Sequence, residues 1–89
     1  MGRPGTPHHY SGTADSKLTK QALTRKLGQA IVIRNIDATN DLLLSLTPSG
    51  KVYYTIPKGQ EFRLDCLFQA FWVAAGAGTA AWCAVTVEG

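Results

Sequence analysis

The chain has few of the residues on which enzymatic and metal chemistry depend. Its 89 residues include only two His and two Cys. The histidines, His8 and His9, are adjacent in a Gly/Pro-rich segment, where nothing in the sequence would hold an imidazole in place for acid–base work. No GxSxG, GxGxxG, P-loop or HExxH pattern occurs. We therefore expect no enzymatic activity, no catalytic residue and no cofactor.

Metal sites and membrane spans are also not expected. Cys66 and Cys83 belong to no CxxC pair, and both are in phase with apolar strand residues, so we expect two small core residues. Asp37, Thr39 and Asp41 lack the Gly and the distal Glu of a calcium loop, which leaves them as turn formers. The apolar stretch from residue 71 to 75 is far too short for a bilayer.

The expected redox state of Cys66 and Cys83 depends on whether the chain carries a signal peptide. The first twenty residues lack the apolar region of a signal peptide, so we expect synthesis inside a cell. Free thiols are the default there, and a single Cys66–Cys83 disulfide is the alternative that remains open.

Charge and apolar residues divide the chain into two parts near Gly28. Residues 1–28 carry five basic residues and one acidic residue, a net charge of +4, whereas residues 29–89 carry four basic and five acidic residues, a net charge of −1. All Phe, Trp, Ile and Val residues lie after residue 30. The composition predicts a basic N-terminal arm over 1–28 and a folded body over 29–89.

The expected arm has two segments. Residues 1–16 contain three Gly and two Pro and show no apolar period, so we expect them to be extended, or disordered when isolated. Residues 17–27 fit a short helical turn, with Ser16 as its cap and Gly28 as its end, or an extended segment anchored by its leucines. The residues that we expect to contact a partner from this arm are Arg3, Tyr10, Lys17, Leu18, Lys20, Leu23, Arg25, Lys26 and Leu27.

The body has the pattern of short strands separated by turns. Apolar residues alternate with polar ones, and turn sequences follow at 37–40, 48–50, 57–59 and 75–78. The expected strands are Ala30–Ile36, Asp41–Thr47, Lys51–Ile56, Glu61–Leu67, Ala70–Ala74 and Thr79–Val87. About six strands at this spacing predict an all-β fold, a small antiparallel β-sandwich with either jelly-roll or immunoglobulin-like strand order.

Two of these strands carry large apolar side chains on both faces. Phe71 and Trp72 are adjacent, so their rings point to opposite faces of the sheet, and Trp82 and Cys83 repeat the pattern. Either the arm or a loop folds over the second face, or this face binds another subunit. We expect Tyr53, Phe71, Trp72 and Trp82 to supply the binding face.

From residue 30 onward the sequence resembles small virion structural proteins of tailed bacteriophages. The resemblance rests on the segment IVIRNIDATNDLLLSLTPSGKVYYTIPKGQEFRLDC and on the closing AAGAGTAAWCAVTVEG. It covers about two-thirds of the chain and consists of strand and turn sequences rather than functional residues. It implies a capsid decoration or cement protein that is assembled in the host cytoplasm and located in the virion.

The expected partners are capsid or tail proteins of the same virion and further copies of the chain. Other head-tail or tail components are the alternative within this class. A nucleic-acid-binding module that uses the basic arm is the alternative from another class, which the low density of basic residues disfavours. A receptor- or glycan-binding module with an exposed aromatic platform is a third.

Overall fold

The computed structural model describes residues 5–24, 27–47 and 53–88, which form eight β-strands and no helix. The antiparallel sandwich expected from the alternating pattern is therefore confirmed. No helix of the described residues is long and apolar enough to cross a membrane. The strands are β1 (Thr6–Ala14), β2 (Thr19–Ala22), β3 (Gly28–Asn35), β4 (Leu42–Ser45), β5 (Tyr54–Ile56), β6 (Glu61–Leu64), β7 (Ala70–Ala75) and β8 (Ala80–Glu88).

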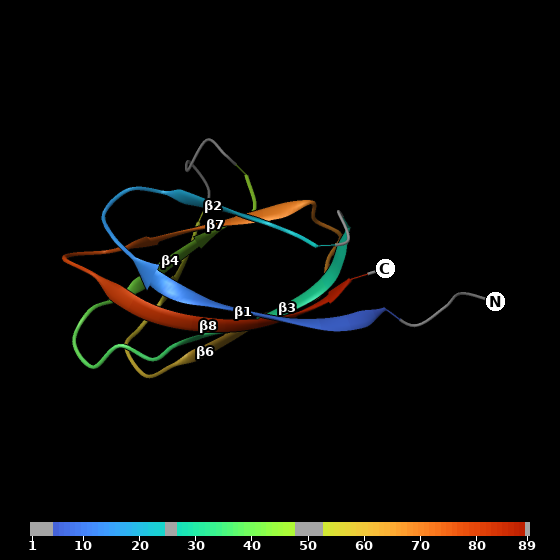
Figure 1. Cartoon of the computed structure of the whole chain (residues 1–89). Helices are drawn as coiled ribbons and strands as arrows, with labels where there is room; N and C mark the ends of the chain where they lie inside the picture. The colour runs from blue at the N-terminus through green and yellow to red at the C-terminus, as the bar shows by residue number, and fades with distance from the viewer. Residues whose placement is uncertain (1–4, 25–26, 48–52, 89) are drawn as a thin grey trace.

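The strands form two four-stranded sheets that face each other (Figure 1). Sheet A has the order β1-β8-β3-β6, and sheet B has the order β2-β7-β4-β5. All neighbours are antiparallel. The chain changes sheet at every connection except the one between β4 and β5, so six of the seven connections join the two layers.

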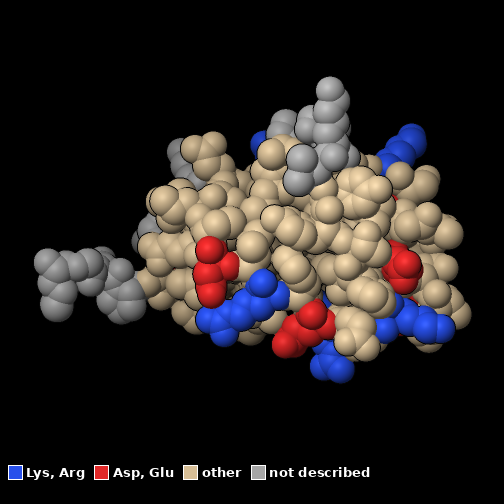
Figure 2. Space-filling view, turned by 180° about the vertical axis from the view of Figure 1, so that it is seen from behind, with Lys and Arg blue, Asp and Glu red and all other residues tan. Residues whose placement is uncertain are grey.

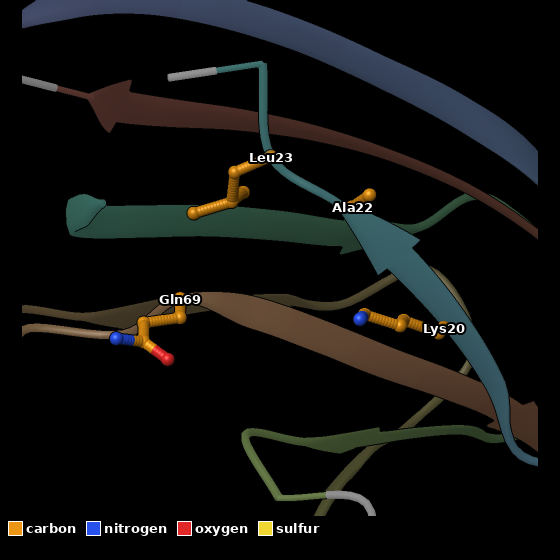
Figure 3. Close-up of a pocket in the computed structure, with 4 residues that line it drawn as sticks. All are labelled: Lys20, Ala22, Leu23 and Gln69. Atoms are coloured by element: carbon orange, nitrogen blue, oxygen red, sulfur yellow. The ribbon is translucent and has the colours of Figure 1, made fainter. Parts of the chain in front are cut away.

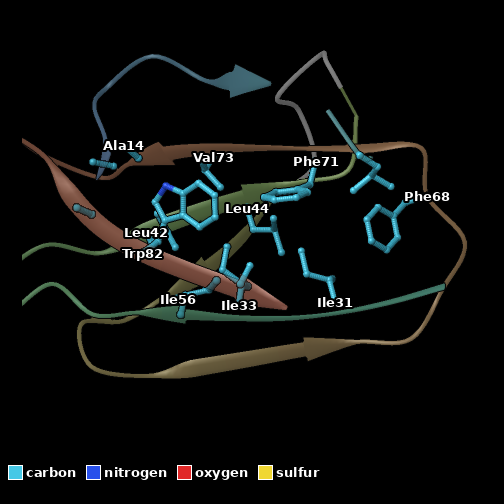
Figure 4. Close-up of a cluster of buried hydrophobic side chains, with 14 residues drawn as sticks. Ala14, Ile31, Ile33, Leu42, Leu44, Ile56, Phe68, Phe71, Val73 and Trp82 are labelled. Carbon is cyan, nitrogen blue, oxygen red and sulfur yellow. The ribbon is translucent and has the colours of Figure 1, made fainter. Parts of the chain in front are cut away.

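The core lies between the sheets and is built by strict alternation. In β8 every second residue from Ala80 to Glu88 is buried, and the residues between are half-buried. The rings of Phe71 and Trp82 meet edge-to-face at the centre, with centroids 5.7 Å apart (Figure 4). Aliphatic side chains of β3, β4 and β5 fill the space around them, and five are at most 1% exposed: Ile31, Ile33, Leu42, Leu44 and Ile56. Each such burial contributes about 1.5–3 kcal/mol to folding.

A completely buried asparagine fixes the end of β3. The Asn35 side chain donates to the carbonyls of Asn40 (2.8 Å) and Ile56 (3.0 Å) and accepts from the Asp37 backbone N–H (3.0 Å). The Asp37 carboxylate then accepts from the backbone N–H groups of Thr39 and Asn40. These bonds lower the pKa of Asp37 from its ordinary value. The expected turn at 37–40 is confirmed.

Much of the expected arm is extended, as one alternative had it, but it belongs to the sandwich and is not a separate arm. β1 and β2 come from residues 1–28, yet β1 pairs with β8 over nine residues and β2 pairs with β7 over four. The structure thus has eight strands rather than about six. The described residues between 17 and 27 contain no helical turn, and Gly28 begins a strand instead of ending a helix. Backbone pairing with two body strands outweighs the weak local preferences of this polar segment.

The expected body strands match β3 to β8, with shorter bounds at several ends. β6 ends at Leu64 rather than at residue 67, because its pairing with β3, its neighbour among the described strands, stops there. The expected turn at 48–50 and the first residues of the strand expected from Lys51 lie outside the described residues.

A buried polar cluster joins the first strand to the last. Tyr10 Oη donates to Glu88 Oε2 at 2.6 Å, and the Thr86 hydroxyl donates to the same oxygen. The Thr24 backbone N–H donates to Tyr10 Oη at 3.0 Å. Glu88 and Thr86 are completely buried. Because a buried carboxylate needs such donors, Tyr10 acts as a structural tie between β1, β8 and the segment after β2.

Candidate functional site

The outer face of sheet B carries a tryptophan, Trp72, that is not part of the core. β7 lies between β2 and β4, with Phe71 and Val73 directed to the core and Trp72 directed outward. Trp72 is half-buried. In the register it lies opposite Lys20 on one side and Ser45 on the other. The Lys20 ammonium is 6.0 Å from the centroid of the indole ring, at the limit of a cation–π contact.

Apolar residues continue this face in the next row. Leu43 lies opposite Ala74, which is only 4% exposed. Leu18 precedes β2 and is half-buried, and neither leucine packs against the core cluster. Tyr53 precedes the edge strand β5 and is 52% exposed. We call the set Leu18, Lys20, Leu43, Tyr53, Trp72 and Ala74 the Trp72 face. A sheet face in contact with water is ordinarily polar, so this face has the composition of a binding surface.

An open hollow of about 460 Å³ lies beside the Trp72 face. Ala22 and Ala70 face each other in the row next to Lys20 and Trp72, and their small side chains leave space. Figure 3 shows Lys20, Ala22, Leu23 and Gln69 around the hollow. Lys20 borders both the hollow and the tryptophan ring, so the two features form one continuous surface.

The residues expected to bind a partner lie in different parts of the structure. Leu18, Lys20, Tyr53 and Trp72 lie on the Trp72 face, where Trp72 is the ring of β7 that points outward. Leu23, Phe71 and Trp82 are buried in the core, at 8%, 0% and 2% exposure, so their expected place on a binding surface is wrong. For the pairs Phe71–Trp72 and Trp82–Cys83, alternation shows that the two side chains point to opposite faces of the sheet. It does not show which of the two points to the core.

The other expected residues lie elsewhere. Tyr10 points inward to Glu88 and is half-buried, which corrects its expected partner contact. Lys17 is exposed in the connection between β1 and β2, and Leu27 is 39% exposed just before β3. Arg3, Arg25 and Lys26 lie outside the described residues.

Leu43, Ala74 and Gln69 are not among the residues that the sequence predicts to bind a partner. Leu43 is the middle residue of three consecutive leucines, and alternation directs it outward when its two neighbours face the core. Gln69 lies in a connection, and only the fold brings it beside Lys20.

The cysteines and histidines do not form a reactive cluster. Cys66 packs against the core, as expected, but Cys83 lies on the outer face of sheet A with Val85 and Val87, so its expected core position is wrong. Both thiols are free. His8 lies opposite the inward Thr86 and His9 opposite the outward Val85, so the two imidazoles point to opposite faces. Among the described residues, no three His, Cys, Asp or Glu side chains gather as metal ligands.

Charges of both signs are mixed on the face seen in Figure 2, with no broad patch of one sign. One exposed ion pair, between Arg63 in β6 and Asp65 just after it, joins the two side chains at 3.5 Å. Such a pair contributes little to stability. The face seen in Figure 2 therefore presents no continuous basic stripe of the kind that follows a nucleic-acid backbone.

The chain matches no protein-family model, no curated protein sequence and no solved structure.

Proposed function

We propose that this protein is a non-enzymatic structural protein of a tailed-phage virion, a decoration or cement protein that binds a protein lattice through the Trp72 face. The observation that carries the proposal is the half-buried Trp72 at the centre of an apolar outer sheet face. Tryptophan in such a setting is typical of residues that dominate interface energies. Lys20 at the rim supplies a charge for orientation.

The strand order supports a finer description of the fold. The orders β1-β8-β3-β6 and β2-β7-β4-β5 favour an eight-stranded jelly roll over an immunoglobulin-like sandwich. Viral capsid domains and lectins use this architecture. Because one fold serves many functions, the proposal rests on the Trp72 face and takes the topology only as consistent with it.

The size of the molecule suits a one-sided attachment. A stable interface covers about 800 Å² on each partner. That area is roughly a seventh of the protein's 5483 Å² surface, which one outer face of a two-layer sandwich can provide. Because β1 and β2 are part of the sandwich, we assign partner binding to the Trp72 face instead of to an N-terminal arm.

The test is incorporation into particles of the phage that encodes the chain. Gradient-purified particles carrying Trp72→Ala should contain at least tenfold less of the protein than wild-type particles, measured by quantitative mass spectrometry. A lost hot spot of about 2–4 kcal/mol corresponds to a thirtyfold or larger loss of affinity. Thr13→Ala, an exposed change on the outer face of sheet A, is the control and should leave incorporation unchanged.

Urea denaturation of both variants separates loss of binding from loss of folding. Absence of the wild-type protein from purified particles would refute the virion assignment. Normal incorporation of a folded Trp72→Ala variant would refute the role of the Trp72 face.

A further inference from the structure

The four edge strands of the sandwich differ in how they are protected from pairing. Every edge strand leaves a row of backbone N–H and C=O groups open to another strand, and proteins block such rows with short strands, charges or proline. β5 has three residues, and β2 has four including Lys20. β6 has four residues, of which Glu61 and Arg63 are exposed charges. These three edges are therefore blocked.

β1 is the exception. It runs for nine residues without an Asp, Glu, Lys or Arg, and it pairs with β8 along one side only. Among the described residues, no backbone hydrogen bond joins β1 to a strand other than β8. Pro7 is its single blocking residue and lies at the second position. Residues 8–14 thus form a continuous, uncharged and proline-free edge.

We infer that β1 pairs antiparallel with β1 of a second copy of this chain, which joins two copies of sheet A into one eight-stranded sheet. A two-fold interface requires a surface that is complementary to itself. A strand without Asp, Glu, Lys or Arg meets this condition, because pairing with a second copy brings no like charges together. Self-pairing of β6 would have to avoid registers that set Glu61 opposite Glu61 or Arg63 opposite Arg63.

The register of the pairing follows from the strand. Facing residues of a continuous sheet have side chains on the same side. One residue of β1 must therefore face its own copy, and the two-fold axis lies midway between these two copies. The proline-free segment 8–14 is centred on Ser11. An axis there sets Ser11 opposite Ser11 of the second copy and His9 opposite Thr13, and it leaves Pro7 outside the ladder.

The strength expected of this contact is modest. One seven-residue ladder covers less surface than the 1,200–2,000 Å² of a standard interface, so we expect a dissociation constant on the order of 10 μM. The contact uses sheet A, whereas the Trp72 face belongs to sheet B. The inference is therefore independent of the proposed function, and the two fail separately.

Sedimentation velocity of the full chain, from about 1 to 300 μM at pH 7.5, tests the inference. The wild-type protein should pass from monomer to dimer, and Ser11→Lys, which sets two ammonium groups against each other at the axis, should weaken the dimer at least tenfold. Thr55→Lys, on the blocked edge β5, and Trp72→Ala should dimerise as the wild type does. A wild-type protein that stays monomeric, or a dimer that Ser11→Lys leaves intact, would overturn the inference.

Disulfide trapping gives a positive readout that does not depend on weakening the dimer. Ser11→Cys is made with Cys66→Ala and Cys83→Ala, because Cys83 lies beside Ser11 in the register and would otherwise compete. Oxidised glutathione should link Ser11→Cys into a covalent dimer, since directly opposite residues on paired strands have Cβ atoms about 4.5–5.5 Å apart. Thr13→Cys in the same background should stay largely unlinked. Equal linking of the two variants, or none, would contradict the proposed axis.

Discussion

Removal of one hydroxyl group, in Tyr10→Phe, tests whether the first strand is a structural part of the sandwich. Tyr10 Oη donates at 2.6 Å to a carboxylate oxygen of Glu88, which is completely buried. A hydrogen bond to a charged group of this kind contributes about 1.5–3 kcal/mol. The phenyl ring keeps its edge-to-face contact with Phe71, whose centroid is 5.8 Å away, so packing is nearly unchanged. We expect Tyr10→Phe to lower the free energy of unfolding by about 2 kcal/mol.

Urea denaturation followed by tryptophan fluorescence measures this effect. With an m-value on the order of 1.5 kcal/mol/M, a loss of about 2 kcal/mol lowers the midpoint by roughly 1.3 M. Tyr53→Phe is the matched control, because Tyr53 is 52% exposed and its change should cost less than about 0.5 kcal/mol. A double-mutant cycle with Glu88→Gln should give a coupling of at least about 1 kcal/mol. Equal midpoints for the two Tyr→Phe variants would refute the structural role of the Tyr10–Glu88 bond.

Three further changes test other parts of the fold. In Gly28→Ala, the new Cβ would lie within 2.6 Å of the Phe68 ring, so we expect a loss of about 1–3 kcal/mol in urea denaturation, whereas Gly76→Ala, with only ordinary contacts, should be nearly neutral. Asn35→Ala removes three hydrogen bonds from a completely buried position and should cost on the order of 3 kcal/mol or more; a change below about 1 kcal/mol would contradict this account. The pKa of Asp37 is lowered in the folded state, so its contribution to stability is present above the ordinary value of 3.8 and is lost as the pH falls through the lower folded pKa. Asp37→Ala should therefore be less stable than the wild type at pH 7, and the difference in thermal midpoint should vanish under strongly acidic conditions.

The truncation of residues 1–28 has a different expected outcome once the fold is known. The sequence division predicts that this truncation leaves a folded body. In the structure, the truncation removes β1 and β2 and uncovers one side of both β8 and β7. We expect the truncated chain to be unfolded, because it also loses the Tyr10 bond to the buried Glu88.

The body strands could be predicted from the sequence because their alternation records which side faces the core. Glu61–Leu64 and Ala80–Glu88 show this pattern almost residue by residue. β1 could not be found in this way, since it lies at an edge and buries mainly Ala14 and part of Tyr10. What holds β1 is backbone pairing with a strand more than sixty residues away, which no local pattern records.

The candidate site was predictable only in part for the same reason. Adjacent aromatic residues indicated that one ring faces outward, and Trp72 is that ring. Lys20 was singled out for its charge, but its position opposite Trp72 depends on the long-range pairing of β2 with β7. A register across distant strands, and the hollow that it creates beside Gln69, require the fold itself.

The pairing of β1 with β8 also sets how the molecule responds to force. Thr6 lies opposite Glu88, so the start of the first strand and the end of the last lie side by side at one end of sheet A (Figure 1). A pull between the residues that precede β1 and those that follow β8 would load this first pair alone, and the ladder would then open one pair at a time. Tension applied in that direction unzips the strands, whereas a load across a docked sheet face acts on many contacts together. Sheet A should therefore open more easily under tension at this end of β1 and β8 than under a load that is shared across the sheet.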